Sequence, residues 1–254
     1  MRMLNKSTDR IASLEKGLRV LECFGDQTPR LTITDVAHQT GLDRATARRC
    51  LLTLHGAGYA DYDGKFFTLT PRVLRLGMNA ISALPLPQIV QPWLDQLTEQ
   101  IGQSCSVALL DGTEIVYIAR AAQKRVMSIG LMPGSRLPAH CTSLGRVLLA
   151  ALPREAALRV VEASDLTPRT PFSITTLDGV MESIDDARTH GYAFIDQEVE
   201  VGLRSLAVPL RDTRGATVAA LNTGMAFTPE SSEEVIAAFL PKLLTVQAGL
   251  ERSI

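Results

Sequence analysis

Four side chains in one short segment have the types and spacing that bind nucleic acid: Arg44, Thr46, Arg48 and Arg49. Three guanidinium groups and a hydroxyl on one exposed helix suit the phosphate walls and base edges of the DNA major groove. Two further cations, Lys65 and Arg10, lie on flanking segments and can reach phosphate. An ordinary solvated surface is the simpler interpretation of each of these side chains.

A second group of side chains has the chemistry to bind a small carboxylate. Arg136 lies in a Gly/Pro loop and can clamp a carboxylate with two hydrogen bonds. A predicted helix begins just after it, and the free N–H groups at a helix start favour an anion. The polar candidates there are His140, Thr142 and Ser143. The alternatives are a surface arginine, a structural histidine and a simple N-cap serine.

Two pairs of residues raise the possibility of catalysis. Cys141 stands beside His140, and Ser205 follows Asp196 at a short distance in sequence. Neighbours in sequence rarely share the geometry that activates a nucleophile, and no nucleophile-elbow, P-loop or metal-ligand spacing is present. We therefore expect no catalytic residue, no metal site and no cofactor.

The elements that position the DNA-binding candidates form a winged helix-turn-helix. Thr32 and Asp35 resemble a capping box, Gly41 suits a tight inter-helix turn, and Asp43 can cap the second helix. An amphipathic helix over residues 11–21 completes a three-helix core. Asp63-Gly64, flanked by two aromatic-rich runs, predicts a two-residue hairpin turn, and this hairpin would be the wing.

The rest of the chain predicts a linker helix and an α+β domain. Residues 72–87 form an apolar helix that Pro85 and Pro87 end, and this helix favours dimerisation. Helices from residue 89 onward alternate with strands joined by short turns, which indicates a largely antiparallel sheet covered by helices. We expect a DNA-binding domain over 1–71, a linker over 72–87 and a second domain over 88–254.

Composition and charge agree with this division. The 254 residues have 46% hydrophobic content and a net charge of −1. Residues 1–75 hold 12 Lys/Arg against 8 Asp/Glu, whereas the remainder holds 14 against 19. A basic front and an acidic back suit a DNA reader joined to a domain that stays off DNA. The four cysteines show no disulfide or zinc spacing, and no apolar run could span a membrane, so we expect a cytoplasmic protein.

Four motifs in order resemble the isocitrate lyase regulator (IclR) family of bacterial transcription factors over essentially the whole chain. They are SLEKGLRVLECF, RLTITDVAHQTGLDRATARRCLLTL, GKFFTLTPRVLRLG and MSIGLMPGSRLPAHCTSLGRVLLAALP. These motifs look like the branch that controls aromatic-acid catabolism through the β-ketoadipate pathway. The resemblance implies a homodimer, often paired into a tetramer, and an effector domain with a GAF-like fold.

The resemblance also implies where the effector binds, namely between the sheet and the loop and helix around residues 134–146. The segment DQEVEVGLRSLAVPL would face it with Asp196, Leu203 and Ser205, and the next strand with Asn222. Ser205 stands where other branches carry Cys, and Asn222 stands where relatives that bind small keto acids have a hydroxyl. Met127 and Ile129 could pack against a ring, or could belong to the core.

The leading hypothesis is a regulator that binds double-stranded operator DNA and responds to protocatechuate, 4-hydroxybenzoate or β-ketoadipate. Effector binding would change the relative positions of the dimer halves through the linker helix. An IclR-type regulator of another small-acid pathway is one alternative. A DNA-binding repressor without a ligand is another.

Overall fold

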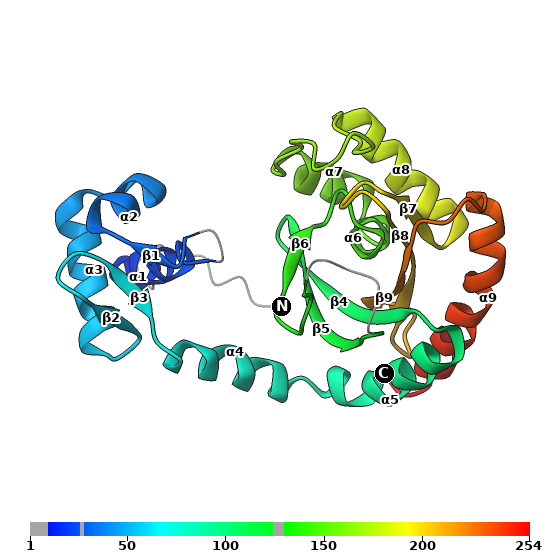
Figure 1. Ribbon diagram of the computed structural model, residues 1–254, viewed down its shortest axis with the longest axis horizontal. Helices are drawn as coiled ribbons and strands as arrows, with labels where there is room; N and C mark the ends of the chain where they lie inside the picture. Colours follow the sequence, from blue (N-terminus) through cyan, green and yellow to red (C-terminus); the bar gives the residue numbers. More distant parts are fainter. Residues whose placement is uncertain (1–9, 26–27, 124–129) are drawn as a thin grey trace. The chain divides into compact units, whose positions relative to one another are not determined.

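The computed structural model describes residues 10–25, 28–123 and 130–254, with only the backbone for residues 78 and 80–83. The chain divides into two units, Met1–Ala80 and Ile81–Ile254 (Figure 1). Most of the strand predicted near residues 126–131, including Met127 and Ile129, lies outside the described residues. No helix in the described part of the chain is long and apolar enough to cross a membrane.

The first unit is the predicted winged helix-turn-helix. Its helices are α1 (Ala12–Glu22), α2 (Ile33–Thr40) and α3 (Arg44–Gly56). A small antiparallel sheet of order β1-β3-β2 completes this unit. Its strands are β1 (Arg30–Leu31), β2 (Ala60–Tyr62) and β3 (Phe67–Leu69). The core of this unit consists of Val20, Leu31, Val36, Ala47, Leu51, Ala60 and Phe67.

Local signals place α2 and α3 as the sequence predicts. Thr32 and Asp35 form a capping box, and Gly41 ends α2 in the left-handed region with φ 69°. Asp43 caps α3 by accepting a hydrogen bond from the Thr46 N–H at 2.8 Å. Arg19 of α1 donates to the carbonyl of Thr40 at the end of α2, which ties the first helix to the turn.

The wing turn lies one residue later than predicted. The Asp63 N–H donates to the Phe66 carbonyl, so Gly64 and Lys65 are the central residues. The Asp63 carboxylate accepts from the N–H groups of Lys65 and Phe66 at 2.9 and 2.7 Å. Because this side chain organises the turn from its first position, the two central positions move to Gly64 (φ 99°) and Lys65.

Two helices follow the wing, α4 (Arg72–Ala83) and α5 (Pro85–Ile101). The linker helix α4 ends at Ala83, just before Pro85, as predicted, whereas Pro87 lies inside the next helix. Pro85 also begins α5, because a proline in the first turn of a helix lacks only an N–H that has no helical acceptor. The helix expected from residue 89 therefore starts four residues earlier.

The second unit is built on a six-stranded antiparallel sheet of order β6-β5-β4-β9-β8-β7. Its strands are β4 (Ser104–Asp111), β5 (Glu114–Ala121), β6 (Arg136–Pro138), β7 (Ala193–Asp196), β8 (Leu203–Arg211) and β9 (Thr217–Ala226). The sequence predicted the segment of β6 as a loop. A strand of three residues at the edge of the sheet is too short to show an alternating pattern.

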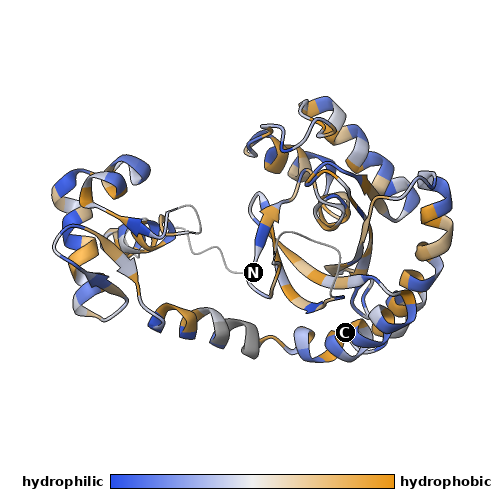
Figure 2. Cartoon of the chain, viewed as in Figure 1, coloured by the Kyte–Doolittle hydropathy of each residue, from blue (hydrophilic) through white to orange (hydrophobic). Residues whose placement is uncertain are grey.

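Helices cover both faces of this sheet (Figure 1). α6 (Ser143–Ala150) lies directly on one face, with α7 (Arg154–Glu162) and α8 (Leu177–His190) outside it. α5 and α9 (Ser232–Leu250) cover the other face. Figure 2 shows strands that are mostly hydrophobic and outer helices that alternate hydrophobic and hydrophilic residues, as two separate apolar layers require.

One glycine sets how closely α6 approaches the chain before it. A Cβ built on Gly145 would lie 2.1 Å from the Ala139 carbonyl oxygen and 2.4 Å from the Ala139 Cα. Only glycine, which has no Cβ, permits this contact, because the neighbouring atoms belong to the backbone and cannot move aside as the end of a side chain can. The start of α6 is therefore fixed against the segment that joins β6 to the helix.

Candidate ligand cavity and nucleic-acid interface

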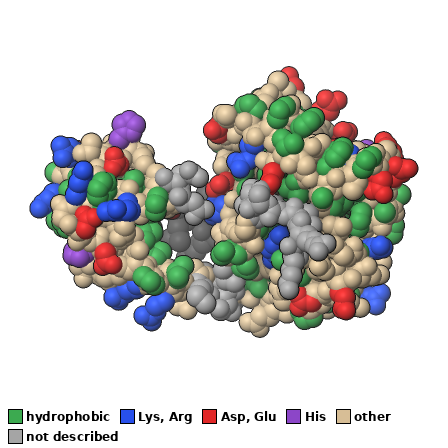
Figure 3. Space-filling model, in the orientation of Figure 1, with side chains coloured by type: hydrophobic (Ala, Val, Ile, Leu, Met, Phe, Trp, Pro, Cys, Tyr) green, Lys and Arg blue, Asp and Glu red, His purple; other side chains and the backbone are tan. Residues whose placement is uncertain are grey.

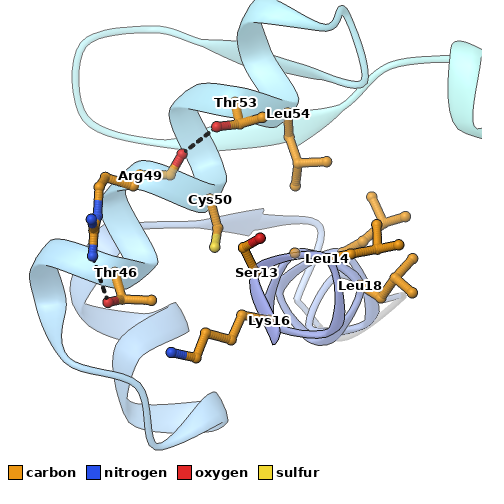
Figure 4. Close-up of a pocket in the computed structure, with 11 residues that line it drawn as sticks. Ser13, Leu14, Lys16, Leu18, Thr46, Arg49, Cys50, Thr53 and Leu54 are labelled. Atoms are coloured by element: carbon orange, nitrogen blue, oxygen red, sulfur yellow. Dashed lines mark hydrogen bonds between the residues drawn. The ribbon is translucent and has the colours of Figure 1, made fainter. Parts of the chain in front are cut away.

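The exposed side of α3 carries three arginines, Arg44, Arg48 and Arg49. Arg44 and Arg48 are four residues apart and share one edge of the helix. Arg49 lies toward the other edge, where its Nη2 donates to the Thr46 Oγ1 at 3.2 Å (Figure 4). The prediction that Thr46 offers an exposed hydroxyl is wrong. Its side chain is buried, because position 46 falls on the flank of α3 that turns toward α1.

The wing adds cations to this unit. Lys65 is exposed at the turn, with its Nζ 5.0 Å from the centre of the Phe66 ring. The guanidinium carbon of Arg30 on β1 also lies over the Phe66 ring, 4.7 Å from its centre, and Arg30 pairs with Asp63 at 2.6 Å. Arg10 is exposed just before α1. Sequence reasoning missed Arg30, because a two-residue strand gives no periodic signal.

Lys and Arg side chains are visible at several places on this unit in Figure 3. Between α1 and α3 runs a groove of about 610 Å³. Figure 4 shows Lys16 and Arg49 toward one end of it and Leu14 and Leu18 toward the other. Ile11, just before α1, and Leu14 and Leu18 within it are 67%, 60% and 51% exposed, so they form an apolar stripe that the described residues leave uncovered.

In the second unit, a cavity lies between the first turn of α6 and the sheet. Its polar lining consists of Tyr117, Arg120, Thr142, Ser143, Ser205 and Asn222. Its apolar lining consists of Leu131, Leu137, Val199 and Leu203, together with Gly224. The structure thus brings together five of the predicted residues from distant parts of the chain: Thr142, Ser143, Leu203, Ser205 and Asn222.

The register of the sheet places a polar row under this cavity. Ser106 of β4 pairs with Arg120 on β5 and with Asn222 on β9, so the three side chains share one face. The Arg120 Nη1 donates to the Ser106 Oγ at 2.9 Å. Burial lowers the pKa of Arg120, although a guanidinium stays charged in proteins. Sequence reasoning missed Arg120, and the available signal was an arginine within the otherwise apolar strand EIVYIARA.

Two buried polar atoms at the cavity have no hydrogen-bond partner within the described part of the protein. They are the Ser143 Oγ and the Asn222 Oδ1. Thr142, and not Ser143, caps α6, because the Thr142 Oγ1 accepts from the Gly145 N–H at 3.1 Å. Buried polar atoms are normally paired, so both atoms are suited to a ligand that carries hydrogen-bonding groups.

Arg136 lies outside this cavity, contrary to the predicted carboxylate clamp. It pairs with Val116 across the β5–β6 ladder, and its guanidinium binds Asp111 and Glu114 at 2.8 and 2.7 Å. Edge strand β6 directs the side chain over the β4–β5 turn, where it is 43% exposed. The guanidinium nitrogens that were predicted to bind the carboxylate of a ligand are therefore already paired with two carboxylates of the protein itself.

Asp196 and His140 also lie outside the cavity lining. Both Asp196 carboxylate oxygens accept from Arg204, at 3.0 and 2.9 Å. His140 is buried, and burial lowers its pKa. Burial also raises the pKa of the neighbouring Cys141 thiol to about 11, which leaves almost no thiolate at neutral pH.

The cavity is narrow. About 30 Å³ of it is wide enough for the centre of a water-sized sphere, which corresponds to one or two water molecules. A ring-sized ligand therefore requires its walls to separate.

Comparison with known proteins gives the same two-part division. The model of the IclR helix-turn-helix domain matches residues 13–64, and that of the bacterial transcriptional regulator IclR C-terminal region matches residues 78–248. The Pca regulon regulatory protein of Pseudomonas putida is 40% identical over 95% of this chain and 84% of its own length. The p-hydroxybenzoate hydroxylase transcriptional activator of Acinetobacter baylyi is 41% identical over 85% of this chain and 82% of its own.

Solved structures of IclR-type regulators are similar to this chain as well. A transcriptional regulator from Rhodococcus sp. RHA1 shares 42% identity with a TM-score of 0.74, covering 96% of this chain and 98% of that one. The inducer-binding domain of a PobR double mutant from Acinetobacter, solved with 3-hydroxybenzoic acid, shares 34% identity with a TM-score of 0.62 over 66% of this chain and 98% of that one. The chain therefore belongs to the IclR family of transcriptional regulators, and it is a DNA-binding regulator and not an enzyme.

Proposed function

We propose that this regulator senses a hydroxylated aromatic monocarboxylic acid and controls genes for the catabolism of such acids. The observation that carries the proposal is the cavity under α6, which combines one arginine, two polar atoms that have no partner among the described residues, and apolar walls. The relatives named for the Pca regulon and for p-hydroxybenzoate hydroxylase, and the PobR domain solved with a hydroxybenzoic acid, support it.

Each part of such an acid has a partner in the cavity. Arg120 is suited to the carboxylate, and Ser143 lies at the α6 start, where free N–H groups favour negative charge. Leu137, Val199 and Leu203 supply contacts for a ring. The Asn222 Oδ1 can accept a hydrogen bond from a ring hydroxyl.

Charge favours a monocarboxylate over β-ketoadipate, which carries two carboxylates. Among the described lining residues, Arg120 is the one cation. A second buried carboxylate would lack a charged partner, and burying an unpaired charge is costly. Protocatechuate and 4-hydroxybenzoate fit this charge pattern better.

For the DNA-reading domain, we propose that Arg44 and Arg48 enter the major groove, while Arg49, Lys65 and Arg10 contact phosphate. Their exposure on one unit with the recognition helix and wing supports this assignment. We assign residues 1–71 to this domain, 72–87 to the linker and 88–254 to the effector domain.

We also propose that the protein works as a homodimer, with a tetramer as a further assembly. Ile11, Leu14 and Leu18 on α1 are exposed, as are Leu74 and Leu76 on α4. Exposed apolar side chains repeated along a helix are typical of a protein–protein contact, and paired half-sites require two DNA-binding domains. Sedimentation of the wild type and of Leu18→Glu tests this, and equal masses at monomer size for both would contradict it.

Calorimetric titration with protocatechuate, 4-hydroxybenzoate and β-ketoadipate tests the sensing function. We expect saturable binding of at least one hydroxybenzoate and weaker binding of β-ketoadipate. Saturation by β-ketoadipate alone would contradict the charge argument. Heat from none of the three would contradict an aromatic-acid sensor.

A further inference from the structure

A fully buried ion pair lies beside the cavity and outside its lining. The Arg146 Nη2 of α6 is 2.8 Å from the Glu198 Oε2, and the two side chains are 3% and 7% exposed. The Arg146 Nε donates to the His140 carbonyl at 3.0 Å, and the Ile174 N–H donates to the Glu198 Oε2 at 3.2 Å. Desolvation of both charges offsets most of the attraction within such a pair, so stability alone is a weak reason for it.

Glu198 belongs to a loop, residues 197–202, that is held in a strained conformation. Gln197 has φ 62°, and it is the one non-glycine residue in the described chain with a positive φ. Its N–H donates to the Leu203 carbonyl at 2.8 Å, and its Oε1 accepts from the Gly202 N–H at 3.0 Å. Strained backbone of this kind persists only where the surroundings over-determine it.

A second loop holds this one from outside. The Thr170 Oγ1 donates to the Gln197 carbonyl at 2.6 Å, and the Ser173 Oγ donates to the Glu198 carbonyl at 2.8 Å. These bonds and the ion pair fix the loop to α6 on one side and to the segment before α8 on the other.

The ion pair joins two walls of the cavity, one formed by α6 and one by the loop. Arg146 lies one helical turn after Ser143, which lines the α6 wall. Glu198 directly precedes Val199, which lines the loop wall, and the loop leads into β8 at the lining residue Leu203. A change in the Arg146–Glu198 contact is therefore a change in the separation of these walls.

The α6 wall is fixed by the close contact at Gly145, whereas the loop is held by the ion pair and by side-chain hydrogen bonds from Thr170 and Ser173. We propose that the Arg146–Glu198 pair is a positioning element that holds the loop against α6 and thereby limits the size of acid the cavity accepts. This inference rests on the proposed sensing function.

Ligand size provides the test. The full-length protein is titrated with 4-hydroxybenzoate and with the bulkier 4-hydroxy-3-methoxybenzoate. Glu198→Gln breaks the pair, and Arg146→Met/Glu198→Leu removes both charges so that neither is left buried alone. Ile184→Ala is the control, because it destabilises the same hydrophobic cluster from α8, and Ile184 belongs neither to the cavity lining nor to the ion pair.

We expect the ratio of association constants, bulkier acid over smaller acid, to rise at least fivefold in the double variant and to stay unchanged in Ile184→Ala. General destabilisation would lower both constants in parallel, so it leaves the ratio unmoved. An unchanged ratio in the double variant, at whatever absolute affinity, overturns the inference.

A measurement without ligand separates this inference from the sensing function. Amide hydrogen exchange at Gln197 and Leu203, whose N–H groups bond to backbone carbonyls, should speed up at least tenfold in the double variant and not in Ile184→Ala. Wild-type exchange rates at these amides in the double variant would show that the pair does not hold the loop. If the wild type binds neither acid, the sensing function fails while this exchange experiment still decides the role of the pair.

Discussion

Replacing Arg120 by Gln should weaken hydroxybenzoate binding far more than replacing Arg136 by Gln. Arg120 lines the cavity, is oriented by its 2.9 Å bond to the Ser106 Oγ, and is partly removed from water. A hydrogen bond between a cation and a carboxylate contributes about 1.5–3 kcal/mol in such a setting, which corresponds to a roughly 10- to 150-fold change in affinity. Arg136 is exposed and bound to Asp111 and Glu114, so we expect a change of less than about twofold.

The assay is calorimetric titration of wild type and both variants with 4-hydroxybenzoate and with the uncharged 4-hydroxybenzamide. If Arg120 recognises the carboxylate, Arg120→Gln should cost much less affinity for the amide than for the acid. Ser106→Ala is the control for lost orientation, because it removes the hydroxyl partner and keeps the cation. A large loss in Arg136→Gln with little loss in Arg120→Gln would refute the reasoning. Equal losses for acid and amide would do the same.

Three further predictions concern other parts of the molecule. If Arg48 contacts a base edge, Arg48→Ala should cost about 1–3 kcal/mol and relax specificity at one position of a selected DNA site; uniform weakening across a panel of substituted sites would assign it to phosphate. Gly145→Ala should lower the free energy of unfolding by about 3 kcal/mol or more, because the new Cβ would lie 2.1 Å from the Ala139 carbonyl oxygen, and a wild-type urea midpoint would contradict this. Because burial lowers the pKa of His140, the folded state binds its proton less readily than the unfolded chain, whose pKa is near 6.5. The stability that His140 contributes is therefore present above pH 6.5 and lost as pH falls below it, and urea titrations should show a flatter decline for His140→Gln between pH 7.5 and 5.5; parallel curves would count against it.

Local signals in the sequence were sufficient for the DNA-reading unit. The Thr32–Asp35 capping box, Gly41 and the Asp43 cap each act over three or four residues, and each is found where predicted. The wing turn shifted by one residue because Asp63 bonds ahead to two backbone N–H groups. Such a preference depends on side-chain geometry that residue types alone do not specify.

The ligand cavity shows where local reasoning ends. Arg136 and Arg120 both lie near a turn in the sequence, and only the pairing of the strands shows that their environments differ. Arg136 lies on edge strand β6 beside two carboxylates, whereas Arg120 lies in the row with Ser106 and Asn222. That row joins residues more than 100 positions apart, so no window of sequence could reveal it.

The Arg146–Glu198 pair illustrates the same limit from another direction. Its two residues are 52 positions apart. An arginine within the apolar helix SLGRVLLA indicates a buried charge, but the sequence does not indicate which acidic residue pairs with it. The caps of α6 could likewise be assigned only in the folded chain, where Thr142 proved to be the cap and Ser143 a cavity residue.

The central claim is that an aromatic acid in the α6 cavity controls transcription. Its most direct test is transcription from a promoter fragment that this protein binds, measured with and without 4-hydroxybenzoate or protocatechuate, for wild type and Arg120→Gln. We predict an acid-dependent change in transcription of at least tenfold for wild type. For Arg120→Gln, we predict the same DNA binding and no response at these acid concentrations. An Arg120→Gln variant that responds like wild type, or a wild type whose transcription ignores both acids, would contradict the account.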